Sequence, residues 1–286
     1  MTSPYLADDR IMPGARGPRL LGVVIVVLIA LGVVGSFTVQ TASAPVEVQA
    51  AAIGRAPELA RHAGTQRISV RVHVSANGRS ATVIETGAVD PVRNIATLHI
   101  EGAAAGGGRI DLVASGTTIY LAVPESRRVF TQGREWISVD ARQFQSQGLG
   151  SGTDMLANLD VLSAVGQHVE KVGRENVHGV PTVHYRAALD LGRVADRLPP
   201  ALQAQAAQLR AVGAPGVPIQ VDVWLDDTGL PRRIEEHLKV QGSAVTVTVE
   251  ISDFGKPVVV SVPAPDDVVP AASLQTALAL IGLATA

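Results

Sequence analysis

The stretch that decides the fold covers residues 219–251 and reads IQVDVWLDDTGLPRRIEEHLKVQGSAVTVTVEI. Apolar side chains at Ile219, Val221 and Val223 alternate with residues of other character, and the last seven residues repeat this alternation. Successive side chains of a strand point to opposite faces of a sheet, so each run has one apolar face. The segment DDTG between the first two runs is typical of a tight turn. These residues predict antiparallel strands with one solvated face.

Strand patterns of this kind extend through most of the chain. The first covers residues 68–74 and precedes Asn77-Gly78, a pair that favours a hairpin turn. Ten or eleven strands with short turns between them predict a meander rather than βαβ units. The other strands are predicted at residues 82–88, 95–100, 109–114, 117–123, 135–139, 168–174, 182–189 and 233–240.

Helical spacing of apolar residues appears between and beside the strand patterns. It predicts helices over residues 48–63, 154–165 and 201–212, and a C-terminal helix from Pro270 to Ile281. The C-terminal helix could cover a cavity as a lid, contact the membrane surface or pack on the core, and core packing is favoured. Since the strands have one apolar face, we expect helices to cover that face. The predicted fold class is therefore α+β, with a strongly curved antiparallel sheet and helices packed on its concave face.

An uncharged apolar segment precedes this domain. No charged residue lies between Arg19 and Glu47, and a helix needs about 20 apolar residues to cross the hydrocarbon layer. Arginines lie before the segment, so the positive-inside rule places the N-terminus in the cytoplasm. We therefore predict a single-pass protein tethered to the cytoplasmic membrane. Its segments would be a cytoplasmic tail (1–19), a transmembrane anchor (20–39), a linker (40–47) and an extracytoplasmic domain (48–286).

A cleaved signal peptide is the alternative interpretation of the apolar segment. Ala42-Ser43-Ala44 has the small residues of a cleavage site, but Pro45 would follow the cut and obstruct it. The long stretch before the apolar run and the length of that run also favour retention as an anchor. Both interpretations export the domain.

The composition argues against several classes of function. The chain has no cysteine, which excludes disulfides, thiolate metal sites and the lipid-modified cysteine of a lipoprotein. The net charge of −2 gives no electrostatic case for nucleic acid. None of the seven histidines has a recognised ligand spacing, and a solvated sheet face accounts for them. Glu235 and Glu236 are adjacent in a strand and face opposite sides. We therefore expect no enzyme, no metal and no cofactor.

Two motifs resemble a known family. Residues 173–185, GRENVHGVPTVHY, and residues 221–233, VDVWLDDTGLPRR, resemble two strand–turn–strand passages of the LppX/LprG family of actinobacterial envelope lipoproteins. That family shares a half-barrel fold with the Lol-type lipoprotein carriers. The resemblance implies a half-barrel sheet bent over helices, an apolar cavity between them, and non-covalent binding and shuttling of acylated lipids. Family members usually carry a lipobox cysteine, whereas this chain has an apolar segment instead.

The sequence leaves two functional hypotheses, both non-catalytic. In the first, an acylated lipid occupies space beneath the curved sheet, because few large aromatic side chains are available to fill it. In the second, the core is filled and the domain serves as an interaction or scaffold domain of the cell envelope, with an unknown protein partner. The side chains predicted to line a lipid cavity are Val70, Val72, Val74, Leu98, Ile100, Leu112, Leu121, Met155, Leu159, Leu162, Val221, Val223, Val247 and Val249.

Overall fold

The computed structural model describes residues 48–76, 78–102, 109–146, 169–190, 218–240 and 243–283. The predicted anchor, the predicted linker and the helices predicted over 154–165 and 201–212 lie outside these residues. Within the described ranges, no helix is long and apolar enough to cross a membrane.

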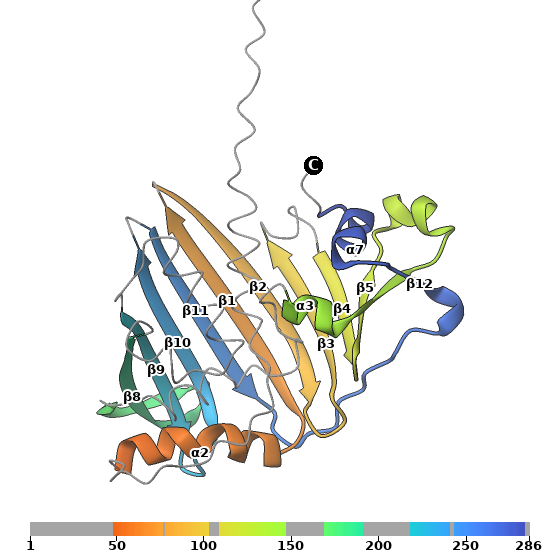
Figure 1. The fold of residues 1–286 in the computed structure, drawn as a ribbon. Coiled ribbons are helices and arrows are strands. Elements are labelled where there is room, and N and C mark those ends of the chain that lie inside the picture. Colours follow the sequence, from red (N-terminus) through yellow and green to blue (C-terminus); the bar gives the residue numbers. More distant parts are fainter. Residues whose placement is uncertain are drawn as a thin grey trace, which may run out of the picture.

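The described strands form one sheet in the order β12-β6-β5-β4-β3-β2-β1-β11-β10-β9-β8-β7 (Figure 1). Strand β1 pairs with both β2 and β11, so one meander runs from it through β6 and another connects β11 back to β7. The pairs are antiparallel except β12 with β6, which is parallel. The strands are β1 (Gln66–Ala76), β2 (Arg79–Asp90), β3 (Ile95–Gly102), β4 (Arg109–Ser115), β5 (Thr118–Ala122), β6 (Trp136–Asp140), β7 (Val169–Val177), β8 (Val180–Asp190), β9 (Pro218–Asp226), β10 (Pro231–Val240), β11 (Ser243–Ser252) and β12 (Val268–Pro270).

All eleven predicted strands are present, and the open, curved, mainly antiparallel sheet confirms that part of the predicted fold class. The twelfth strand, β12, escapes prediction because three residues are too few to display a period of two. Its partner β6 is more than a hundred residues away in the sequence, so no local turn signal reveals the pairing.

Two helices pack on the same face of the sheet. Helix α2 (Val48–His62) contributes to one core cluster, and helix α7 (Leu274–Ile281) contributes to another. Ile251 belongs to the first cluster and Ile68 to the second, and these two residues pair directly in the sheet. Directly paired residues lie on one face. We call the face that holds Ile68 and Ile251 the inner face, and the other the outer face. The short helices are α3 (Ala141–Ser146), η2 (Glu125–Thr131) and η4 (Pro265–Asp267).

The sequence locates α2 to within one residue but places the start of α7 too early. Helix α7 begins at Leu274, because Pro270 ends β12 and Ser273 is the N-cap residue. The hydroxyl of Ser273 accepts a hydrogen bond from Thr276 N–H at 3.1 Å. The helix ends at Gly282, whose φ of 89° suits glycine. Its packing on the core is confirmed by the buried side chains Leu274, Ala277 and Ile281.

The core of the described residues has three clusters along the inner face. One contains residues of α2 and of β7–β11, and one contains residues of α7 and of β1–β6. Between them is a cluster that consists of strand residues alone, which we call the central cluster. Its buried members are Val70, Val72, Val83, Ile100 and Val247.

Gly87 allows two strands of the inner face to approach closely. A Cβ atom at this position would lie 2.1 Å from Thr97 O and 2.7 Å from Leu98 Cδ2. The Thr97 oxygen is backbone and cannot move without disturbing the pairing of β2 with β3. We therefore expect Gly87→Ala to lower the free energy of unfolding by about 3 kcal/mol, as overpacking of a tight core does.

Chemical denaturation measures this effect, and Gly173→Ala is the matched control. Gly173 also lies in a strand, but a Cβ there meets no atom within 4 Å. Its substitution should change stability by less than about 0.5 kcal/mol. Equal losses in the two variants would show that the close approach at Gly87 is not required.

Candidate functional site

A row of side chains crosses the inner face from β9 to β4. The register pairs each member with the next, so that the side chains stand side by side on one face. All but one are aliphatic, and most are β-branched. The members in order are Val223, Ile234, Val249, Val70, Glu85, Ile100 and Ile110.

The predicted lining residues that fall within the described ranges all lie on the inner face, but in separate clusters. Val221 and Val223 pack with α2, whereas Leu98, Leu112 and Leu121 pack with α7. The structure brings together Val70, Val72, Ile100 and Val247 in the central cluster, with Val74 and Val249 against it. Met155, Leu159 and Leu162 lie outside the described residues. The role of all the predicted lining residues in holding a lipid stays a prediction.

Glu85 is the inner-face residue that sequence reasoning missed. It is 2% exposed, and its Oε1 makes no hydrogen bond within the described part of the chain. Burial raises the pKa of Glu85 to about 8, so the carboxyl group is mostly protonated at neutral pH. The sequence feature that could have revealed Glu85 is the alternation of faces along a strand, which puts Glu85 on the same face as Val83 and Val89. Ile84, between Val83 and Glu85, hides that pattern because it is also apolar.

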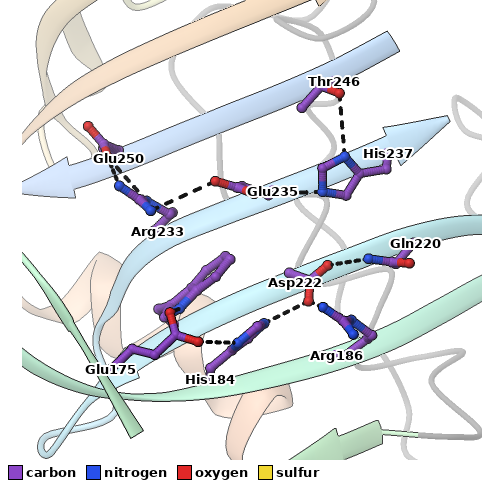
Figure 2. Close-up of polar contacts among 11 residues, drawn as sticks. Glu175, His184, Arg186, Gln220, Asp222, Arg233, Glu235, His237, Thr246 and Glu250 are labelled. Atoms are coloured by element: carbon purple, nitrogen blue, oxygen red, sulfur yellow. Dashed lines mark hydrogen bonds and ion pairs between the residues drawn. The ribbon is translucent and has the colours of Figure 1, made fainter. Parts of the chain in front are cut away.

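A polar cluster occupies the outer face of strands β7–β9 (Figure 2). His184 Nδ1 lies 2.8 Å from Glu175 Oε1, and its Nε2 lies 2.6 Å from Asp222 Oδ1. The ring of Trp224 stacks on His184 with centroids 4.2 Å apart, and its Nε1–H donates to Glu175 Oε2. Arg186 Nε also donates to Asp222 Oδ1, at 2.8 Å. The cluster thus joins three strands through one buried imidazole.

The two carboxyl groups around His184 are held ionised. A hydrogen bond from Trp224, followed by one from His184, lowers the pKa of Glu175. Burial raises the pKa of Asp222, but hydrogen bonds from Gln220, His184 and Arg186 outweigh it, so this pKa also lies below its ordinary value. Ionised carboxylates only accept hydrogen bonds, so the ring of His184 lies between two acceptors.

The burial of His184 corrects the prediction that a solvated sheet face accounts for the histidines. His184 is 5% exposed, because Trp224 covers its ring and carboxylates occupy both ring nitrogens. An aromatic residue at an outward position of the strand pattern, Trp224, was the available signal. Across the described ranges, no group of three or more metal-ligating side chains is arranged to hold an ion.

The two family-like motifs meet at this cluster. They lie on paired strands, where Thr182 is opposite Asp226 and His184 is opposite Trp224. Each motif also closes its own turn: Asn176 Oδ1 accepts from Gly179 N–H at 2.6 Å, and Asp226 Oδ1 accepts from Leu230 N–H at 3.0 Å. The motifs therefore specify two hairpin turns and the contact between them, which are features of the fold.

Comparison with known proteins gives one relative by sequence. No family model matches the chain. A protein of Streptomyces griseus, described as "Uncharacterized 31.2 kDa protein in rplA-rplJ intergenic region", is 29% identical over 161 residues. The match covers 52% of this chain and 52% of that protein, so it spans about half the length of the relative.

Solved structures give similarities over a larger share of the chain. LprF from Mycobacterium bovis is 14% identical with a TM-score of 0.46, over 78% of this chain and 100% of that one. The Mycobacterium tuberculosis lipoprotein LppX is 15% identical with a TM-score of 0.45, over 74% and 98%. A LolA superfamily protein from Nitrosomonas europaea is 10% identical with a TM-score of 0.28, over 72% and 93%. Proteins of the LppX and LolA kinds, which the two motifs resemble, are thus among the solved structures to which this chain is similar.

Proposed function

We propose that this protein is an extracytoplasmic lipid-binding or lipid-transfer protein, tethered to the cytoplasmic membrane through residues 20–39. Its inner face would hold the acyl chains of an acylated lipid between the curved sheet and the helices. Binding of this kind needs no reactive residue, so the function is non-catalytic.

The observation that carries the proposal is the central cluster. Its buried members come from strands alone, and none comes from a described helix. The neighbouring clusters, by contrast, contain residues of α2 and α7. The Val and Ile side chains of this band, which Glu85 interrupts, match an acyl chain in polarity, and α2 and α7 contribute no member to the band.

The hydrophobic effect is strong enough to hold a lipid there. Each methylene group that leaves water contributes about 0.8 kcal/mol, so ten buried methylenes contribute roughly 8 kcal/mol. Losses of translational and conformational freedom offset part of this amount. For a long acyl chain, the binding free energy that remains is enough for the lipid to stay bound during purification.

The test is native mass spectrometry of the full-length protein purified in detergent. We expect acylated lipids to co-purify with it and to be displaced by added acylglycerol. A protein that carries no lipid and also ignores added acylated lipid would contradict the proposal. That result would favour the alternative function, a non-catalytic envelope interaction or scaffold domain with a filled core.

A substitution in the central cluster is expected to reduce the bound lipid. Val72 is a buried member, and Val72→Phe adds a ring that competes with an acyl chain for the inner face. We expect the ratio of lipid-bound to free protein to fall at least about fivefold, which equals ~1 kcal/mol of binding free energy. The measurement is the ratio of lipid-bound to free protein in the native mass spectrum.

The matched control is His73→Phe, the same substitution at the next residue, which lies exposed on the outer face. It should leave lipid binding unchanged. Circular dichroism of both variants reports whether the sheet is retained. A folded Val72→Phe protein that binds as much lipid as the parent would show that the central cluster does not hold the ligand.

A further inference from the structure

One carboxyl group interrupts the apolar row of the inner face. Glu85 on β2 has Val70 of β1 on one side and Ile100 of β3 on the other. Both neighbours belong to the central cluster, as does Val83, which precedes Glu85 on the same face. The carboxyl group is therefore surrounded by aliphatic side chains, at 2% exposure.

A buried carboxyl group at position 85 lowers the stability of the protein, and the fold does not require one there. A buried polar atom without a hydrogen bond loses the bonds that it made with water. Oε1 of Glu85 is such an atom within the described part of the chain. Valine or isoleucine, which occupy the neighbouring places in the row, would fill this place without that loss. An unsatisfied group of this kind calls for an explanation outside the fold.

A role in ligand binding would explain the unsatisfied carboxyl group. Ligand sites are mostly apolar and contain a few polar groups that orient the ligand. The inner face around Glu85 has this composition, since one carboxyl group lies within a band of Val and Ile side chains. A ligand with one matching polar group would satisfy Oε1 or the proton on the group, while its apolar part would contact the rest of the row.

The chemistry of the carboxyl group selects the ligand group. Burial favours the neutral acid, whose O–H is a hydrogen-bond donor. The best partner is then an uncharged acceptor. An ester carbonyl meets this requirement. The hydrocarbon chain attached to that carbonyl would contact the apolar side chains of Val70 and Ile100. A cationic head group would need the ionised carboxylate, which burial disfavours.

We propose that the carboxyl group of Glu85 donates a hydrogen bond to an ester carbonyl of the bound lipid and so sets the preference for acylated over purely ether-linked or hydrocarbon ligands. This assignment rests on the proposed function, because it concerns the ligand of the same face.

The test compares two lipids that differ in the carbonyl alone. Dioleoylglycerol and the dioleyl diether of glycerol have the same chain length and hydroxyl group. They are added at equal concentration to the full-length protein in detergent, and native mass spectrometry gives the ratio of the two complexes. We expect the parent protein to favour the ester about tenfold, the effect of one hydrogen bond.

Three variants separate the role of Glu85 from its place in the fold. Glu85→Leu should bind both lipids equally, because leucine has no donor. Glu85→Gln should keep most of the ester preference, because the amide group still donates. Glu101→Leu changes an exposed glutamate on β3 and should behave as the parent protein does.

The outcomes distinguish this assignment from the proposed function. If the parent protein binds both lipids equally, lipid binding stands and the role of Glu85 is wrong. The same holds if Glu85→Leu keeps the ester preference. If the parent protein binds neither lipid, the proposed function is wrong and the assignment of Glu85 is wrong with it.

Discussion

At pH 8 the Glu85→Gln protein is expected to be more stable than the parent protein by about 4 kcal/mol, and near pH 4.5 the two should be similar. The reason is the buried carboxyl group. Burial raises the pKa of Glu85 from 4.5 to about 8 in the folded protein. In the unfolded chain the same group has its ordinary pKa.

The sign of the effect follows from the protons bound in each state. Below pH 4.5 the carboxyl group is protonated in both the folded and the unfolded protein, so it adds no pH dependence. Between pH 4.5 and about 8 the folded protein keeps a proton that the unfolded chain releases. The free energy of unfolding therefore falls as pH rises through this window, by up to about 1.4 kcal/mol per pH unit. Glutamine does not titrate and removes the slope.

Urea denaturation at pH 5, 6, 7 and 8 measures this slope in the parent protein and the variant. Glu236 is a second carboxyl residue on the inner face, in the row of Val221 and Val247, so Glu236→Gln is measured beside it. Glu101→Gln serves as the exposed control. A parent protein and a Glu85→Gln protein with the same dependence on pH would show that water reaches this carboxyl group.

The strands could be predicted because each carries its own signal. Val70 and Val72 alternate with Arg71 and His73, and this local pattern is enough to define β1. The turn residues between the strands define the meander in the same way. Strand β12 and the start of α7 depend instead on contacts between distant segments. The local sequence pattern of a three-residue strand is too short to predict such a contact.

The polar features of both faces could not be predicted for a different reason. The alternation assigns Glu85 to a face, but only the register places it between Val70 and Ile100. His184 likewise sits at an outward position of β8, and the pattern alone makes it solvated. It is buried because Trp224 comes from another strand and covers it. Burial of a polar group depends on its neighbours on the adjacent strands. Those neighbours are distant in the sequence, so the local pattern around the group does not reveal them.

The outer-face cluster predicts the second large effect, a loss of stability on removal of Asp222. This carboxylate accepts hydrogen bonds from His184 Nε2 at 2.6 Å, from Arg186 Nε at 2.8 Å and from Gln220 Nε2 at 2.7 Å. Leucine at this position would leave the buried His184 ring with one carboxylate partner instead of two, and Arg186 without its carboxylate. We expect Asp222→Leu to lower the free energy of unfolding by about 3–5 kcal/mol, as the loss of one member of a buried ion pair does.

The pH dependence of the parent protein offers an independent check. Because the pKa of Asp222 is lowered in the folded state, this group stabilises the fold above its ordinary pKa of 3.8. That contribution is lost as pH falls below this value, through the folded-state pKa, and Asp222→Asn should remove it.

Asp111 provides the matched control for Asp222 on the same sheet. It also contacts a histidine and an arginine, His99 and Arg109, but its side chain is 37% exposed. Asp111→Leu should therefore cost less than about 1 kcal/mol, because solvent screens exposed ion pairs. Chemical denaturation of the two leucine variants at pH 7 compares them directly. Similar losses at both positions would mean that the cluster around His184 is as hydrated as the surface pair, and that stacking by Trp224 does not seal it from water.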